Sequence, residues 1–326
     1  MNILITGVGG LLGSNFSKFL LDNTEYNVIG IDDFSGGYRD FVDNRVKLYN
    51  IDLKEPINIE EKIDYIFHFA AFAAEGLSPF IRNYVTKNNV ETSNQVINFA
   101  INNSVKKVIF TSSMAVYGRG KAPFDENDIP NPIDPYGVSK LSTEIDLRCM
   151  KEQFNIDYCI IRPHNVYGIQ QNIWDRYRNV LGIWMRKLLN NEPITVFGDG
   201  LQRRAFTYID DILQPLLNSI DSRTNGHIIN LGGIYPISLV AAANILKDIV
   251  GFGEPIEFLE KRHEVHQAFS TYDKSVELLD FSHKTDIKDG LIKMWEWAKN
   301  QPEREVINFD YEVERGLYVF WKNWVR

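Results

Sequence analysis

The chain has 326 residues, of which 44% are hydrophobic and 24% are charged. This length and composition suit a large α/β domain with a smaller lobe, and they argue against a disordered chain. The net charge of −8 argues against nucleic acid or an anionic membrane as a partner, although a local cluster of arginines could still bind an anionic ligand.

The cysteines and the first residues bear on location. Cys149 and Cys159 are too few for a disulfide framework, and their apolar surroundings predict two buried thiols in a reducing compartment. The chain begins with an apolar run, without a charged leader, and has no apolar stretch of about eighteen residues. We therefore expect a cytoplasmic protein that does not enter a membrane.

The first half of the chain alternates short apolar runs with amphipathic stretches. The runs at residues 3–6, 27–31, 46–49, 65–69, 107–111 and 158–161 are predicted strands. The stretches at residues 11–21, 79–102 and 136–154 are predicted helices. Apolar strands separated by helices indicate a doubly wound parallel sheet, which is a Rossmann-type α/β fold.

Beyond Gly168 this alternation loosens. Polar loops at residues 170–179 and 198–204 precede two further predicted helices, at residues 238–249 and 289–300. We expect a Rossmann domain over residues 1–168, to which residues near 205–235 could return, and a smaller α/β substrate lobe over residues 169–326. The last twenty-one residues are predicted to pack against another part of the chain, because they carry Phe309, Tyr311, Tyr318, Phe320, Trp321 and Trp324.

A glycine-rich turn joins the first predicted strand to the first predicted helix. Gly7 permits the tight turn, Gly10 lets the backbone approach a pyrophosphate, and Gly13 allows close packing of helix and strand. The helix N-terminus offers unpaired N–H groups and a favourable dipole to a phosphate. The turn therefore predicts a dinucleotide-binding site.

Two acidic residues narrow the choice of dinucleotide. Asp32 ends the second strand, roughly twenty residues after the turn, where a carboxylate accepts hydrogen bonds from the ribose hydroxyls. The same carboxylate would repel a 2′-phosphate, so NAD is favoured over NADP. Asp52, which follows the third strand, is placed to meet the adenine edge.

The sequence also predicts a catalytic group at the end of the fifth strand. Ser113 follows that strand, and Tyr136 and Lys140 lie one turn apart on one face of the next helix. An ammonium group beside a phenol favours the phenolate and lowers the pKa of the phenol. We expect Tyr136 to act as the general base for a sugar hydroxyl, with Ser113 relaying its proton.

Together, the glycine turn, Asp32, residues 68–71, Ser113 and the Tyr-x-x-x-Lys pair resemble the extended short-chain dehydrogenase/reductases. Residues 162–168 and 197–211 are similar to those of the nucleotide-sugar epimerase/dehydratase branch. The resemblance covers nearly the whole chain. It implies that Ser113, Tyr136 and Lys140 are catalytic, that NAD is the cofactor, that a nucleotide sugar is the substrate, and that no metal takes part.

The resemblance further implies two sets of binding residues. The set assigned to NAD is Gly7, Gly10, Leu11, Leu12, Gly13, Asp32, Asp33, Asp52, Leu53, Phe69, Ala70, Ala71, Asn89, Tyr136, Lys140 and Pro163. The set assigned to the nucleotide sugar is Ser113, Asn165, Asn179, Val180, Phe197, Arg204 and Arg262. Guanidinium groups bind phosphate oxygens in pairs, which suits Arg204 and Arg262 to the diphosphate of the substrate.

The reaction is inferred from two residues that cannot transfer a proton. Sugar 4,6-dehydratases of this branch carry an Asp-Glu pair directly after the catalytic Ser or Thr, whereas this chain has Met114 and Ala115. Elimination thus lacks its acid and base, and 4-epimerisation through a transient 4-keto sugar is favoured. The alternatives are a 4-oxidase or 4-keto reductase, the dehydratase itself, and a non-catalytic NAD-binding sensor.

The identity of the sugar and of the nucleotide stays open at this point. UDP is the expected nucleotide, with GDP and CDP as alternatives. In a loose alignment, Ala268 falls where bulk would limit the substituent on sugar C2, so an N-acetyl group could fit. The predicted helices at residues 79–102 and 136–154 resemble those through which these enzymes form homodimers.

Overall fold

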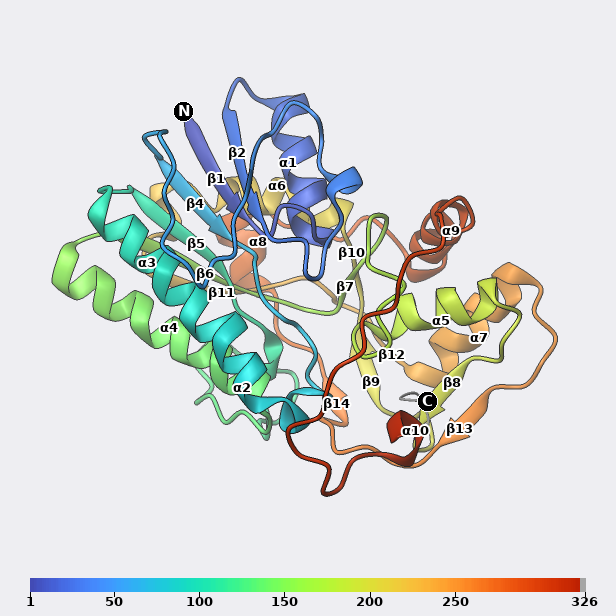
Figure 1. Ribbon diagram of the computed structural model, residues 1–326. Helices are drawn as coiled ribbons and strands as arrows, with labels where there is room; N and C mark the ends of the chain where they lie inside the picture. The colour runs from blue at the N-terminus through green and yellow to red at the C-terminus, as the bar shows by residue number, and fades with distance from the viewer. Residues whose placement is uncertain (323–326) are drawn as a thin grey trace.

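Seven parallel strands form the central sheet of the computed structural model, which describes residues 1–322 (Figure 1). They are β1 (Asn2–Thr6), β2 (Asn27–Asp32), β3 (Lys47–Asn50), β4 (Tyr65–His68), β5 (Lys107–Thr111), β6 (Asp157–Pro163) and β11 (His227–Leu231). Their spatial order is β3-β2-β1-β4-β5-β6-β11, and every neighbouring pair is parallel. The predicted Rossmann-type fold is confirmed.

The direction of the strand order reverses between β1 and β4. The chain passes outward from β1 to β3 on one side, and then from β4 to β11 on the other. Ligands of open α/β sheets bind in the crevice outside the carboxyl ends of the strands at such a reversal. The fold therefore places its ligand site above the ends of β1 and β4.

Helices cover both faces of the sheet because its strands bury alternate side chains in two separate cores. Ile3 and Ile5 pack with α1 (Leu11–Asn23), α6 (Asp210–Asn218) and α8 (Asp273–Leu279). Leu4 packs on the opposite face with α3 (Thr92–Asn102) and α4 (Pro135–Phe154). Burial on both faces explains why these strands are continuous apolar runs.

The stretch predicted as one helix at residues 79–102 is divided in the structure. A 3₁₀ turn, η2 (Ser78–Phe80), is followed by α2 (Arg82–Val85), a π-helical segment η3 (Thr86–Glu91), and α3. Ile81 leaves the helical region with φ −138° and ψ 50°, which separates the first two elements. π-Helical turns insert an extra residue and often mark functional sites.

The cysteine prediction is half correct. Cys159 is fully buried on β6, whereas Cys149 is an exposed thiol. Cys149 lies on α4, which packs only one side against the sheet and leaves the other uncovered. Neither thiol forms a disulfide.

The second lobe consists of short strands and helices beyond the carboxyl edge of the sheet (Figure 1). Its strands are β7 (Val166–Tyr167), β8 (Thr195–Phe197), β9 (Arg203–Ala205), β10 (Thr207–Tyr208), β12 (Pro236–Ser238), β13 (Glu257–Leu259) and β14 (Gln267–Ala268). Its helices are α5 (Val180–Leu189), α7 (Leu239–Val250), α9 (Ile287–Ala298) and α10 (Val319–Lys322). The sequence predicted α7 and α9, and it missed α5, α6 and α8, which are shorter; α6 also contains Pro215.

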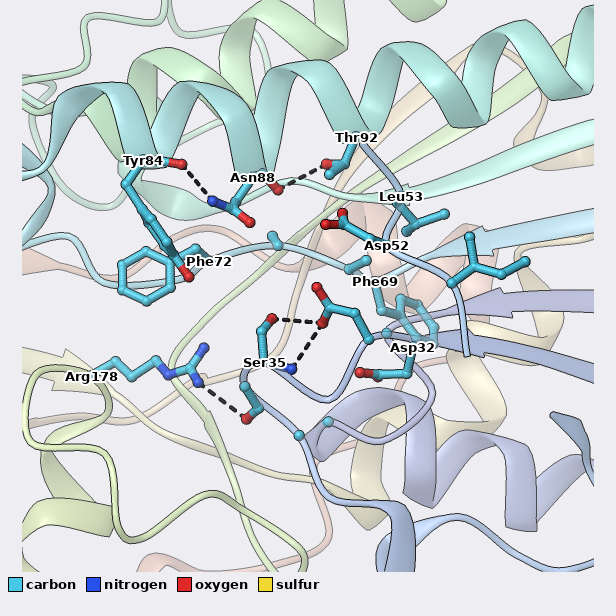
Figure 2. A pocket seen from close by; sticks show the side chains of 18 residues that line it. Asp32, Ser35, Asp52, Leu53, Phe69, Phe72, Tyr84, Asn88, Thr92 and Arg178 are labelled. Atoms are coloured by element: carbon cyan, nitrogen blue, oxygen red, sulfur yellow. Dashed lines mark hydrogen bonds between the residues drawn. The ribbon is translucent and has the colours of Figure 1, made fainter. Parts of the chain in front are cut away.

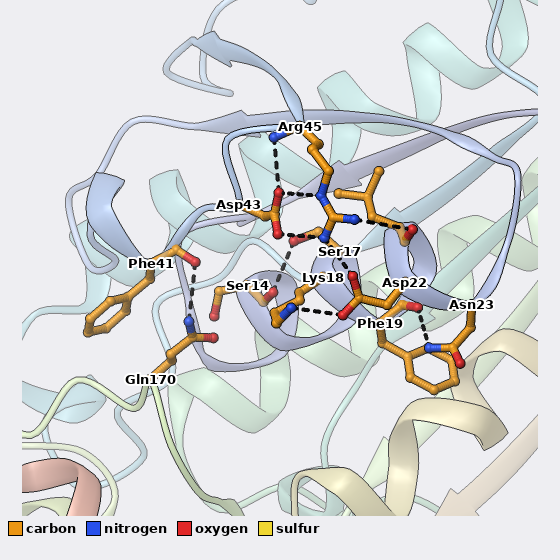
Figure 3. Close-up of polar contacts among 11 residues, drawn as sticks. Ser14, Ser17, Lys18, Phe19, Asp22, Asn23, Phe41, Asp43, Arg45 and Gln170 are labelled. Carbon is orange, nitrogen blue, oxygen red and sulfur yellow. Dashed lines mark hydrogen bonds and ion pairs between the residues drawn. The ribbon is translucent and has the colours of Figure 1, made fainter.

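The loop after β2 is held from both parts of the molecule (Figure 3). The Arg45 guanidinium binds the carboxylates of Asp43 and of Asp22 on α1. From the other side, the Gln170 side-chain amide donates a hydrogen bond to the Phe41 carbonyl oxygen at 3.4 Å. The Arg304 guanidinium carbon lies 4.0 Å from the centre of the Tyr38 ring, so the loop is fixed at its outer end as well.

The aromatic C-terminal segment packs where the sequence alone could not place it. Phe309, Tyr311, Tyr318, Phe320 and Trp321 join a core cluster with Phe72, Phe80 and Tyr177, and Trp324 lies outside the described residues. Figure 1 shows this segment running from α9 past α2 to α10. The Glu312 carboxylate accepts hydrogen bonds from the Asn83 and Tyr84 N–H groups of α2, at 2.8 and 3.0 Å.

Replacement of Trp321 tests how firmly this segment is bound. Trp321 is 1% exposed, so Trp321→Ala should lower the free energy of unfolding by about 3–5 kcal/mol through the cavity that it leaves. Val319 on the same short helix is 59% exposed, and Val319→Ala should change stability by less than about 0.5 kcal/mol. Chemical denaturation measures both, and equal effects would contradict the packing described.

Candidate active site

The glycine turn after β1 is as tight as its sequence predicts. Gly7 has φ +73°, and a Cβ there would lie 2.7 Å from the Ala70 nitrogen. A Cβ on Gly13 would lie 2.2 Å from the Gly7 carbonyl oxygen, so this position needs glycine for close packing of α1 against the turn. Gly10 is different, because a Cβ there would meet only the Gly7 oxygen, at 3.4 Å, and the residue borders two cavities.

Asp32 lies beside this turn and stabilises it by hydrogen bonds to the backbone. One of its carboxylate oxygens accepts a hydrogen bond from Gly9 N–H at 2.8 Å, and the other accepts one from Phe34 N–H at 2.7 Å. Burial raises the pKa of Asp32 above its ordinary value, while these two hydrogen bonds oppose that shift. The carboxylate faces the cavity above β1 and β2.

Figure 2 shows this first cavity, with Asp32, Asp52, Leu53 and Phe69 on one side and Arg178 across from them. The cavity is also lined by residues that were not predicted from the sequence, namely Ser35, Gly36, Gly37, Ile51, Phe72, Tyr84, Asn88, Thr92 and Arg178. The Gly36-Gly37 pair was a readable signal, because it follows the strand that ends at Asp32. Arg178 was not readable, since it comes from the second lobe and reaches the Gly36 carbonyl oxygen at 3.1 Å.

The structure does not bring Asn89 into this cavity. Its side chain is 2% exposed, accepts a hydrogen bond from Phe72 N–H at 2.7 Å and donates one to the Ser139 hydroxyl at 2.9 Å. The preceding residue, Asn88, lines the cavity instead. The π-helical turn of η3 changes the direction of successive side chains, and a regular helical pattern could not anticipate that.

A larger adjoining cavity, of about 330 Å³, contains the three predicted catalytic residues. Ser113 ends the segment after β5, and Tyr136 and Lys140 project from the first turns of α4. Asp134 caps this helix by accepting a hydrogen bond from Gly137 N–H at 2.8 Å, and Pro135 occupies its first position. The cap fixes where the helix begins and thus where Tyr136 lies.

The electrostatics of the pair differ from the prediction. Burial raises the pKa of Tyr136, although the neighbouring Ser113 hydroxyl opposes that shift. The Lys140 ammonium nitrogen instead donates a hydrogen bond to the Thr111 carbonyl oxygen at 2.8 Å, 6.0 Å from the centre of the Tyr136 ring. Burial also lowers the pKa of Lys140 to about 7, so the lowered phenol pKa predicted from spacing is not found in this structure.

A buried ion pair lies beneath these residues. The Arg162 guanidinium on β6 forms two hydrogen bonds with the Glu144 carboxylate on α4, at 2.9 and 2.6 Å. The Ser112 hydroxyl donates a third hydrogen bond to the same carboxylate. Both charged side chains are 1% exposed, and this group joins α4 to the ends of β5 and β6.

Two predicted arginines meet in the second lobe. The Arg204 and Arg262 guanidinium groups bind the same Glu264 oxygen, at 2.8 and 3.1 Å. Both line a cavity with Phe197, Asn179 and Val180. The arrangement gathers two cations around one anionic oxygen, and guanidinium groups bind phosphate oxygens as well as carboxylate oxygens.

Asn165 joins the catalytic part to the arginine part. It lines both cavities, and its side-chain amide donates a hydrogen bond to the Ala205 carbonyl oxygen at 3.3 Å. Its φ of +40° lies in the left-handed region, which Asn tolerates better than most residues. Every predicted site residue except Asn89 thus borders one of these connected cavities.

Residues 1–322, the part of the chain that the structure describes, contain neither a metal-binding cluster nor a membrane-spanning helix. No group of three or more His, Cys, Asp or Glu side chains in this part could hold a metal ion. None of its helices is long and apolar enough to cross a membrane.

The buried ion pair supplies a stability test. Glu144→Gln keeps the shape of the side chain but leaves the Arg162 charge uncompensated, so the free energy of unfolding should fall by about 3–5 kcal/mol. The exposed Glu152→Gln on the same helix should change it by less than about 0.5 kcal/mol. The double variant Glu144→Leu with Arg162→Met should recover much of the loss in urea denaturation, and a loss as large as that of Glu144→Gln would contradict the role of the charge.

Comparison with known proteins gives consistent similarities. The model of the family described as "NAD dependent epimerase/dehydratase family" matches residues 3–232. An uncharacterised UDP-glucose epimerase of Bacillus subtilis is 30% identical over 312 residues, which span 89% of this chain and 96% of that protein.

Two solved structures are similar along almost their whole length. The UDP-glucuronic acid 4-epimerase of Bacillus cereus, in complex with UDP-glucuronic acid and NAD, has a TM-score of 0.83 and 29% identity, covering 92% of this chain and 99% of that one. The UDP-N-acetylglucosamine 4-epimerase of Methanobrevibacter ruminantium has a TM-score of 0.83 and 27% identity, covering 91% of this chain and 97% of that one.

Proposed function

Because this chain belongs to the NAD-dependent epimerase/dehydratase family, we propose that it is an NAD-dependent 4-epimerase of a UDP-hexose. The observation that carries this proposal is the composition of the cavity wall around Ser113 and Tyr136. Met114 and Ala115 are 7% and 5% exposed and border the substrate cavities directly beside Ser113. Neither can move a proton, so a 4-keto sugar formed here meets no acid or base from these two positions for eliminating its 6-hydroxyl group.

The residues present fit NAD. Gly7 and Gly13 permit the tight turn and its close packing against α1, and Gly10 borders both cavities at the start of α1, where a pyrophosphate would bind. Asp32 accepts one backbone hydrogen bond on each oxygen and lines the cavity, so its carboxylate keeps acceptor capacity for ribose hydroxyls. Bound by these residues, NAD would supply the hydride chemistry at sugar C4 that inversion of this centre needs.

The side chains of the protein transfer the proton and position the sugar. We assign Tyr136 to take the proton from the 4-hydroxyl group and to return it, with Ser113 hydrogen-bonded to the same oxygen. Lys140 stands one turn away, with a pKa lowered to about 7 by burial, so it can exchange protons near neutrality. Arg204 and Arg262 are assigned to bind the diphosphate. Their ion pairs with the Glu264 carboxylate then either break or persist beside the diphosphate.

The identity of the substrate is proposed from two observations. One is the small side chain at one position of the cavity wall, and the other is the names of similar proteins. UDP sugars are favoured because the similar structures hold UDP-glucuronic acid or are named for UDP-N-acetylglucosamine. Ala268 is fully buried and borders the cavity that Ala115 and Arg204 share, so no bulky side chain opposes a substituent there. UDP-glucose, UDP-galactose and their N-acetyl forms are the proposed substrates.

The reaction can be tested directly. An NMR time course of the purified protein with UDP-glucose or UDP-N-acetylglucosamine should show interconversion with the galacto form and no net change in NADH. Tyr136→Phe should lower the rate by about 100-fold to 10,000-fold, because proton transfer from the 4-hydroxyl group is lost. Tyr158→Phe, on the sheet outside the cavities, is the matched control.

Three outcomes would contradict the proposal. Accumulation of a 6-deoxy-4-keto sugar would indicate a dehydratase, and stoichiometric NADH would indicate a 4-oxidase. Full activity of Tyr136→Phe would contradict the assigned base.

We also propose that the enzyme is a cytoplasmic homodimer. Two free thiols suit a reducing compartment. On α4, Val138 and Ile145 are 54% and 47% exposed and lie two turns apart on one face, which also carries the exposed Cys149. A groove between α3 and α4 continues this surface, and a second copy of the two helices would cover it.

Ile145→Glu tests the dimer. A charge in the centre of a helix-to-helix interface should shift the mass measured by light scattering from two chains toward one. Ile129→Glu is the control, since Ile129 is 87% exposed and lies on a loop outside α3 and α4. A wild-type protein with the mass of one chain at micromolar concentration would contradict the dimer.

A further inference from the structure

Glu75 lies where the catalytic and arginine parts of the site meet. It follows β4 in the loop at residues 69–77, and it borders three adjoining cavities. One contains Ser113 and Tyr136, the second contains Met114 and Ala268, and the third contains Arg204, Arg262 and Phe197. If a nucleotide sugar binds with its diphosphate at the arginines and its C4 at Tyr136, its hexose ring lies beside Glu75.

The loop that carries Glu75 is fixed by its backbone. The Glu75 carbonyl oxygen accepts hydrogen bonds from the Ser78 hydroxyl at 2.8 Å and from Ser78 N–H at 3.2 Å. The next residue is Gly76, where a Cβ would lie 2.9 Å from an Arg262 nitrogen. The Glu75 side chain therefore starts from a defined point at the wall of the cavity.

No described residue binds the Glu75 carboxylate, although two arginines lie nearby. Arg204 and Arg262 both bind Glu264 instead. The neighbouring acid, Asp134, is engaged as the cap of α4. Of the three acids in this part of the described site, Glu75 is thus the one whose carboxylate remains for a ligand.

Charged groups of both signs surround Glu75. Asp134 and Tyr136 face it from α4, Arg204 from β9, and Arg262, His263 and Glu264 from the segment before β14. Arg176 and Arg178 stand across the third cavity. Glu75 is exposed to solvent on part of its surface, but the protein atoms around its carboxyl group desolvate it and raise its pKa to about 7, and the charge of Asp134 adds to this shift.

We propose that Glu75 determines the sugar class, accepting hydrogen bonds from the hydroxyl groups of a neutral hexose and discriminating against a uronic acid. This inference rests on the proposed UDP-hexose epimerase function and extends it to substrate selection. A uronate carboxylate beside Glu75 would bring two anions together in a partly desolvated cavity. A neutral hexose offers donors and no charge.

The discrimination should depend on pH in a defined direction. Above the raised pKa of Glu75 the carboxylate is charged and opposes a uronate, whereas below it the group is a neutral acid that can donate a hydrogen bond to the uronate. Binding of UDP-glucuronate thus requires uptake of a proton that UDP-glucose does not require.

The test compares kcat/KM for UDP-glucose and UDP-glucuronate at pH 6 and pH 8.5. The wild type should prefer UDP-glucose by about tenfold or more at pH 8.5, with a smaller preference at pH 6. Glu75→Gln should reduce the preference at pH 8.5 by about tenfold, equal to about 1.4 kcal/mol, and should remove its pH dependence. Glu254→Gln, an exposed change away from the cleft, should behave as the wild type.

A second measurement needs no substrate. A carboxyl group whose pKa is raised on folding destabilises the protein increasingly as pH rises from its ordinary value to the raised one. Glu75→Gln should therefore have a higher thermal midpoint than the wild type at pH 8.5, and the gain should shrink at pH 6. Equal midpoints at both values would contradict the raised pKa of the Glu75 carboxyl group.

The two proposals fail in different ways. If the wild type converts none of the UDP sugars, the proposed function is wrong. If the wild type epimerises UDP-glucose but accepts UDP-glucuronate equally well at pH 8.5, or if Glu75→Gln keeps the wild-type preference, only the role of Glu75 is wrong.

Discussion

The buried ion pair between Arg162 and Glu144 is the constraint on which the catalytic geometry depends. Two charges that are 1% exposed are tolerated only because they bind each other and the Ser112 hydroxyl. Glu144 lies one helical turn after Lys140, which in turn lies one turn after Tyr136. The three side chains on this face of α4 therefore meet three successive residues of the chain leaving β5, with Glu144 at Ser112, Lys140 at Thr111 and Tyr136 beside Ser113.

The site is completed by contacts that cross between the sheet and the second lobe. The loop after β2 carries one wall of the dinucleotide cavity, and Gln170 and Arg178 hold it from the lobe. The C-terminal segment caps α2 through Glu312 and brings Phe320 and Trp321 to the wall of the arginine cavity. Residues of at least four segments, far apart in the chain, thus enclose one continuous space.

Charge is distributed so that an acidic protein can bind an anionic substrate. The chain has a net charge of −8, yet Arg204, Arg262 and Arg178 gather in the cleft. Glu264 balances two of them and holds their guanidinium groups close together. Glu75 lines the same cavity as Tyr136 and also borders the arginine cavity, which is the position from which it is proposed to select the sugar.

The sequence by itself determined the sheet, the glycine turn, Asp32 and the Tyr136–Lys140 pair. These features are local, since strand period, turn glycines and a four-residue helical spacing follow from backbone geometry. Only the tertiary structure decided that Asn88 and not Asn89 borders the cavity, that Cys149 is exposed, and that Glu264 joins the arginines. It also decided the pKa direction of Tyr136, because burial and the position of the Lys140 nitrogen depend on contacts between residues distant in the chain, which no local pattern records.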